Sequence, residues 1–207
     1  MQKQEPLWPA LLALIAVGGL HLAMPDSLSI GPRWLLLAVI AIIMVPVEIL
    51  HIRGNHDYCR KAGYMVLILV TLAMLFSLVR LVTAIPDRIQ TPADLLRSAI
   101  FLWITNVFVF AVWYWRIDAG GPHRRGLREI HTKEEAAFLF PQMTWDGDKN
   151  WSPKFMDYLF LAFNTSTALS PTDAPVLSRK AKSLMILQAS ISLMVIVLMV
   201  ARAVNIL

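Results

Sequence analysis

Residues 64–85, YMVLILVTLAMLFSLVRLVTAI, contain a single charged side chain, that of Arg80. An α-helix needs about 20 consecutive apolar residues to cross the roughly 30 Å hydrocarbon core of a bilayer, and this stretch is long enough. Residues 7–24, 34–52, 95–115 and 184–207 are similarly apolar, and the five stretches hold half of the 207-residue chain. The sequence therefore predicts an all-α fold, a polytopic helical membrane protein with five transmembrane helices.

The composition supports the same class. Hydrophobic residues make up 57% of the chain and charged residues 16%, whereas a soluble domain has roughly 25% charged residues. The single Cys59 excludes an intrachain disulfide and a metal site built on several thiolates. Membrane proteins use Lys and Arg for topology and for contact with lipids, anionic ones included, so the net charge of +5 does not predict a nucleic-acid partner.

Lysine and arginine residues are distributed unequally between the two sides of such a bundle. Fourteen of the nineteen belong to the N-terminus, the 53–61 loop, the long segment 116–154 and the 179–182 turn, which share one side. The loops of the other side contain only Arg33 and Arg88. Positive charge favours the cytoplasmic side of a membrane. We therefore expect a multi-pass protein of the cell membrane with its N-terminus and long segment in the cytoplasm.

A further apolar segment, residues 155–163, ends early at the polar run Asn164-Thr165-Ser166-Thr167. It is too short to cross a bilayer comfortably, so a re-entrant segment or a short sixth membrane segment is expected. Non-helical backbone at membrane depth must be surrounded by protein or by a water-filled cavity. The chain thus divides into a three-helix N-terminal membrane region, 1–94, and a second region, 95–207. The second region holds an outer helix, a long basic and aromatic loop, the short segment and the last transmembrane helix.

The second region resembles the pore-helix, filter and inner-helix module of the potassium-channel superfamily. Thr165 and Thr167 match the paired threonines of that module, and the next six residues match its filter without a gap. The same stretch is similar to uncharacterised bacterial integral membrane families, which implies a bacterial inner membrane. The resemblance implies a homo-oligomer that passes monovalent ions, with these pore-loop residues: Thr165, Thr167, Ala168, Leu169, Ser170, Pro171, Thr172 and Asp173.

The filter itself is degenerate. A potassium filter uses glycines for its backbone conformation, but Leu169, Ser170 and Pro171 stand here, and proline fixes φ and removes a backbone donor. Two readings remain open for this stretch. It is either a wider pore loop for non-selective or non-potassium permeation, or an ordinary turn in which Asp173 caps the helix that follows.

The charge distribution conflicts with the usual channel orientation. Pore loops of potassium channels enter from outside, whereas residues 155–167 would enter from the basic, cytoplasmic side. Three explanations remain: the module is inverted as in ionotropic glutamate receptors, the segment spans the membrane, or the likeness is only local.

Ionisable and polar side chains inside the predicted spans are costly and are candidate functional residues. Arg80, Arg97 and Arg202 are expected at one membrane face, where they either ring an anion path or lipid headgroup site or extend to the interface. Glu48 and His51 have the i, i+3 spacing of helical metal ligands, but they also suit an ordinary polar span end, and no metal site is assigned. Asn106 is expected to form a hydrogen bond between helices.

Catalytic signatures are lacking in the sequence. There is no nucleophile elbow, Gly-rich phosphate loop or paired acidic motif, so neither an enzyme nor a cofactor is predicted. The leading hypothesis is an oligomeric, ion-channel-like membrane protein. The alternative is a non-conducting membrane protein whose basic loop binds lipid or a partner.

Overall fold

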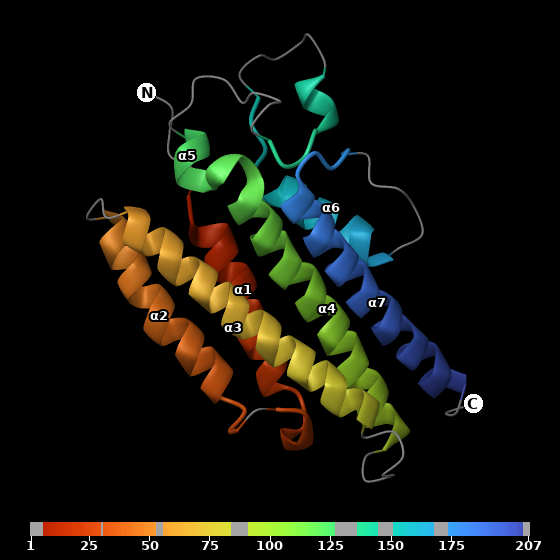
Figure 1. Cartoon of the computed structure of the whole chain (residues 1–207). Coiled ribbons are helices and arrows are strands. Elements are labelled where there is room, and N and C mark those ends of the chain that lie inside the picture. The colour runs from red at the N-terminus through yellow and green to blue at the C-terminus, as the bar shows by residue number, and fades with distance from the viewer. Residues whose placement is uncertain are drawn as a thin grey trace.

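The computed structural model describes residues 6–29, 31–52, 56–83, 91–126, 136–144, 151–167 and 174–204. In this part of the chain the regular elements are helices, and one isolated antiparallel β-bridge joins Phe138 and Val176. Figure 1 shows the arrangement of the helices. The longer helices are α1 (Trp8–Leu22), α2 (Leu35–Ile52), α3 (His56–Thr83), α4 (Pro92–Ile117), α6 (Phe155–Thr167) and α7 (Arg179–Val204). The short ones are η1 (Asp26–Leu28), η2 (Asp118–Gly120), α5 (Pro122–Gly126) and η3 (Pro141–Met143).

The predicted all-α fold is confirmed, and among the described residues three helices are long and apolar enough to cross a membrane. These candidate spans are Tyr58–Thr83, Ala93–Gly120 and Arg179–Ala201. The first two predicted spans form apolar but shorter helices, Trp8–Leu22 and Leu35–Val47. With a rise of about 1.5 Å per residue, a helix such as α1 is shorter than the hydrocarbon core is thick.

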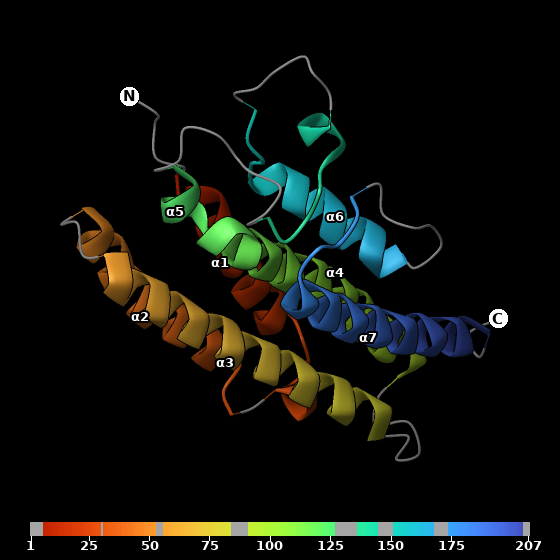
Figure 2. The same cartoon turned by 45° about the horizontal axis from the view of Figure 1, so that its top comes forward.

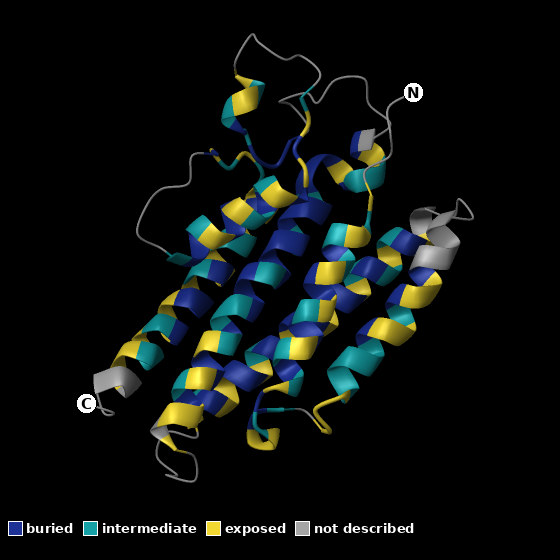
Figure 3. Ribbon diagram, turned by 180° about the vertical axis from the view of Figure 1, so that it is seen from behind, coloured by how far each residue is buried: buried dark blue, intermediate teal, exposed yellow. Residues whose placement is uncertain are grey.

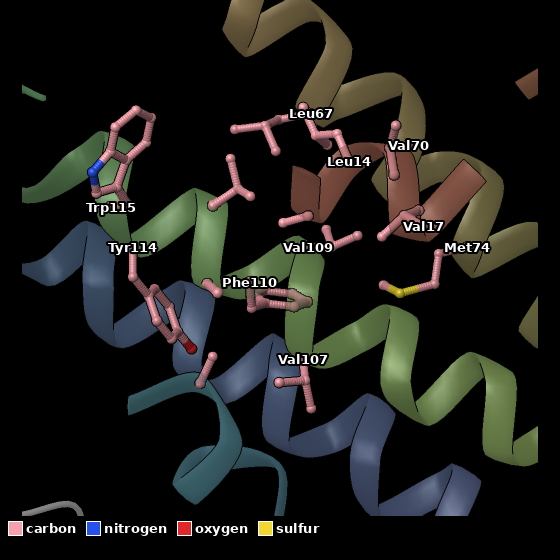
Figure 4. Packing of buried hydrophobic residues seen from close by; sticks show 14 of the residues in the cluster. Leu14, Val17, Leu67, Val70, Met74, Val107, Val109, Phe110, Tyr114 and Trp115 are labelled. Atoms are coloured by element: carbon pink, nitrogen blue, oxygen red, sulfur yellow. The ribbon is translucent and has the colours of Figure 1, made fainter. Parts of the chain in front are cut away.

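Helix α4 lies at the centre of the bundle. It packs against α1, α3, α6 and α7, while α2 packs against α1 and α3, as the two views of Figures 1 and 2 show. One hydrophobic cluster extends through α1, α3 and α4, with Phe110 and Val109 fully buried. Figure 4 shows these side chains interdigitating. The core therefore includes residues from both halves of the chain.

Burial differs strongly between the central and the outer helices. In the apolar window of α4, 61% of the residues are buried, against 22% in that of α7. Figure 3 shows exposed residues along the outer faces of the helices. Among them are large apolar side chains such as Ile42, Ile186 and Val197. An apolar exterior of this extent requires lipid or a protein partner around it.

Two local signals determine where helices begin. Thr91 is the N-cap of α4 and accepts a hydrogen bond from the Asp94 N–H, and Pro92 takes the first helical position, where a missing donor costs nothing. Helix α3 begins at His56, eight residues before the predicted apolar span. The polar residues at its start can form a helix, but a search for runs of apolar residues does not detect them. The predicted 53–61 loop is therefore wrong at its C-terminal end, where residues 56–61 belong to α3.

The two ends of the bundle differ in charge. We call the end that holds Trp8, Ile117, Phe155 and Arg179 the loop end. Basic residues gather there in α3, α4, α5 and α7. The described basic residues at the loop end are Arg60, Lys61, Arg116, Arg124, Arg125, Lys154, Arg179, Lys180 and Lys182.

Candidate functional site

The chain segments immediately before and after helix α6 meet at the loop end. The Lys154 N–H donates to the Asp157 carboxylate (2.7 Å), which satisfies a free donor at the helix start. The segments before and after α6 are joined by backbone hydrogen bonds from Leu139 N to Pro175 O and from Leu177 N to Ala137 O, both 2.9 Å. The thirteen residues of α6 are therefore flanked by two segments that lie side by side, and α7 starts from that same end.

Helix α6 packs against α4 and α7 (Figure 2). Its buried side carries Tyr158, Leu161, Ala162 and Ser166. Its other side exposes Met156, Phe160 and Phe163. The short helix is thus held between the outer and the last helix of the second region and leaves one apolar side uncovered.

Asn106 of α4 is the centre of a buried polar network that joins these three helices. Its Nδ2 group donates to Ser192 Oγ of α7 (2.6 Å), to the Gln188 carbonyl (3.3 Å) and to Ser166 Oγ of α6 (3.4 Å). The two serine hydroxyls are 3.0 Å apart. Asn106 thus forms hydrogen bonds between helices, as expected from its position in an apolar span.

Gln188 of α7 extends the network toward the loop end. Its side-chain amide donates to the Ala162 carbonyl (2.8 Å) and to Ser166 Oγ (3.0 Å), and its Oε1 accepts from the Tyr114 hydroxyl. Gln188, Ser166 and Asn106 are fully buried. Because each unsatisfied polar group in an apolar medium is costly, the network selects one register of α4, α6 and α7.

The two threonines matched to the filter are turned toward their own helix. Thr165 Oγ1 donates to the Leu161 carbonyl (2.8 Å) and is buried, and Thr167 Oγ1 donates to the Asn164 carbonyl (2.9 Å). The other predicted filter positions, residues 168–173, lie outside the described residues. Their pore-lining role stays a prediction.

A second buried polar cluster fastens the loop end. The Asp118 carboxylate accepts from the Ala137 N–H (2.6 Å) and from the Tyr158 hydroxyl (2.5 Å). Arg125 Nη1 donates to the Trp115 and Asp118 carbonyls (2.7 and 2.9 Å), and its guanidinium lies 5.1 Å from the Tyr158 ring centroid. These contacts tie η2, α5 and the start of α6 to the end of α4.

The arginines predicted in the spans have separate partners. Arg80 is exposed, and its Nε donates to the Ser27 carbonyl (3.0 Å). Arg97 is exposed, with its guanidinium 5.2 Å from the Phe101 ring centroid on its own helix. Both belong to the end opposite the loop end, as predicted from topology, but these contacts do not form a ring. The backbones of Glu48, His51 and Arg202 are helical, whereas their side chains lie outside the described residues.

The side chains that the structure describes contain no group of three His, Cys, Asp or Glu residues placed to hold a metal ion. Sequence reasoning missed Tyr114, Gln188 and Ser192, which complete the polar network. The available signal was the i, i+4 spacing of Gln188 and Ser192 in an otherwise apolar helix. Asp118, in the cluster at the loop end, carried no such signal because its partners are distant in sequence.

The chain matches no protein-family model, no curated protein and no solved structure at a significant level. The evidence on function therefore consists of its own residues and their geometry.

Proposed function

We propose that this chain is a multi-pass protein of a bacterial inner membrane in which α6 is a re-entrant helix, and that oligomers of it pass monovalent ions without potassium selectivity. The observation that supports this best is the position of α6. It is a half-length helix between an outer helix, α4, and a last helix, α7, with both flanking segments paired at the loop end. A pore-loop module would place its short helix in this way, and the position of α6 supports the proposal on that ground.

The described residues of α4, α6 and α7 pack closely against one another within one protomer. The interface of α4, α6 and α7 is closed by hydrogen-bonded side chains around Asn106 and Ser166. An ion path in this proposal therefore lies between copies, beside the uncovered sides of α6 and α7. The low burial of α7, 22% of its apolar window, leaves a surface on which such copies can pack.

A hollow beside α6 supports this location. It has a volume of about 140 Å³, and the polar side chains of Gln142, Asp157 and Asn164 line it together with apolar neighbours. Asp157 is half-buried and belongs to the first turn of α6. A carboxylate and an amide at the mouth of a pore favour cations over anions.

Planar-bilayer recordings of the purified protein test permeation directly. We expect cation conductance from verified oligomers, with little preference for potassium. Asn164→Leu in the hollow should change the conductance. The control, Tyr58→Leu, alters an exposed residue at the start of α3, outside the hollow and away from α6 and α7, and should leave the conductance unchanged. Absence of conductance in every salt and at every voltage would refute the proposal.

The orientation of the re-entrant helix is tested by cysteine labelling in a Cys59→Ser background. Ser152 lies just before α6, and Ser27 lies in η1 at the opposite end of the bundle. A membrane-impermeant reagent added from outside should label Ser27→Cys and spare Ser152→Cys. Labelling of Ser152→Cys from outside would contradict the cytoplasmic assignment. Leu177, which is exposed, reports the segment after α6. Labelling of Leu177→Cys from outside while Ser152→Cys stays protected would contradict the re-entrant path.

A further inference from the structure

A cleft opens at the loop end, between the start of α3, the end of α4 and the turn into α5. Its volume is about 80 Å³. Three arginines and one histidine line it, and none of the lining residues is acidic. The lining residues are Leu7, Cys59, Arg60, Tyr64, Arg116, Gly120, Gly121, Pro122, His123 and Arg124.

Arg116 forms the inner wall of the cleft and is held in place. It is only 9% exposed. Its Nη1 donates to the Arg60 carbonyl (3.3 Å), its guanidinium lies 5.8 Å from the Tyr64 ring centroid, and the Tyr64 hydroxyl donates back to the Arg116 carbonyl (3.1 Å). Among the described residues no acidic side chain forms an ion pair with it. Within the part of the chain that the structure describes, the buried Arg116 guanidinium therefore has no ion-pair partner, and a buried charge without a counter-charge is costly.

Two glycines make the space that the arginines occupy. A Cβ at Gly63 would lie 1.9–2.2 Å from the guanidinium atoms of Arg116, so only glycine lets that side chain lie against α3. A Cβ at Gly120 would lie 2.7 Å from Cδ of Arg124, and Gly120 has a φ of +81° that L side chains rarely adopt. The first glycine therefore lets the Arg116 guanidinium lie against α3, and the second lets the aliphatic part of Arg124 lie against the turn before α5.

We propose that this cleft binds the phosphate of an anionic membrane phospholipid. Arginine presents a planar fork of donors that matches phosphate oxygens, and Arg60, Arg116 and Arg124 approach the cleft from three different elements. The cleft lies at the basic end of the bundle, which the positive-inside rule assigns to the leaflet rich in anionic lipid. Leu7, just before α1, gives one wall an apolar side chain for the upper part of an acyl chain.

Lipid retention in nanodiscs tests this proposal independently of conductance. The full-length protein is placed in phosphatidylcholine discs with and without phosphatidylglycerol, and native mass spectrometry counts the lipids that remain bound. Arg60→Gln with Arg124→Gln should weaken retention of one phosphatidylglycerol by at least about tenfold, as expected from the loss of charge-assisted hydrogen bonds. The matched control, Arg179→Gln with Lys180→Gln, removes the same charge at the same end outside the cleft and should retain the lipid.

A second variant keeps every charge. Gly63→Ala favours the helix but displaces the Arg116 guanidinium, so the protein should keep its helical circular dichroism and lose the bound lipid. Equal retention in the wild type and in both cleft variants would overturn the proposal, as would equal loss in the control.

Inorganic phosphate, titrated into discs of phosphatidylcholine alone, separates a lipid from a soluble anion. Weak binding of inorganic phosphate beside strong retention of phosphatidylglycerol supports the proposal. Strong binding of inorganic phosphate that phosphatidylglycerol cannot displace would overturn the assignment to a lipid. If the protein retains the lipid but conducts no ions, the proposed pore is refuted and the proposed lipid site is not affected.

Discussion

The buried network between α4, α6 and α7 allows a quantitative prediction. Gln188→Leu keeps the approximate volume of the side chain but removes three hydrogen bonds, to Tyr114, Ala162 and Ser166. Hydrogen bonds between membrane helices contribute about 0.6 kcal/mol on average and at most about 1.7 kcal/mol, so the variant should lose about 2 kcal/mol of unfolding free energy. Reversible unfolding in mixed micelles with increasing dodecyl sulfate, followed by circular dichroism, measures this loss.

A double-mutant cycle isolates one bond of the network. Tyr114→Phe removes only the hydroxyl that donates to Gln188, and alone it should cost about 0.6–1.7 kcal/mol. Gln188→Leu already removes that hydrogen bond. The loss of unfolding free energy in the double variant should therefore be smaller than the sum of the two single losses, by a similar amount. Ser190→Ala, an exposed position on the same helix, is the control and should stay within about 0.5 kcal/mol of the wild type. Additivity within about 0.3 kcal/mol would refute the contact.

Three further predictions concern packing and charge elsewhere. Gly18→Ala should destabilise the protein by about 1–3 kcal/mol in the same assay, because its Cβ would lie 2.6 Å from an α2 side chain, while Gly19→Ala, with open space around it, should not. Asp118→Asn should cost about 1.5–3 kcal/mol of unfolding free energy, since the carboxylate accepts two buried hydrogen bonds; an unchanged midpoint would contradict this role. The hydrogen bonds from Arg33 lower the pKa of Asp26. The stabilisation that they give is therefore present above the usual aspartate pKa and is lost as the pH falls through the lowered value. Arg33→Gln should raise the Asp26 pKa in a carboxyl NMR titration, and an unchanged pKa would refute the pairing.

The positions of the helices could be predicted because their signal is local. Apolar runs of about the length of a span identified α1, α2, α4 and α7 to within a few residues, apart from the polar first turn of α7. The start of α3 was missed because residues such as Arg60 and Lys61 are good helix formers that carry no apolar signal. The early end of the short segment at Thr167 followed from its polar run, and α6 ends there.

The candidate site could be predicted only in part. Asn106 stood out as a polar residue in an apolar span, but its partners did not, since Ser166 and Ser192 are 60 and 86 residues away along the chain. Arg116 looked like one more basic residue at a span end. Its burial against Tyr64 depends on a close approach of α3 and α4 that Gly63 permits, and no local pattern reports such an approach.

The sequence by itself determined that this is an apolar helical protein with a basic side and one helix too short to span, because hydrophobic length and charge are properties of single segments. The tertiary structure decided which polar groups meet. It placed Asn106, Gln188 and Ser166 in one closed network and brought Arg60, Arg116 and Arg124 to one cleft. These groupings depend on the register and separation of packed helices, which bring together side chains that are far apart in the sequence, and a buried polar group is costly without a hydrogen bond.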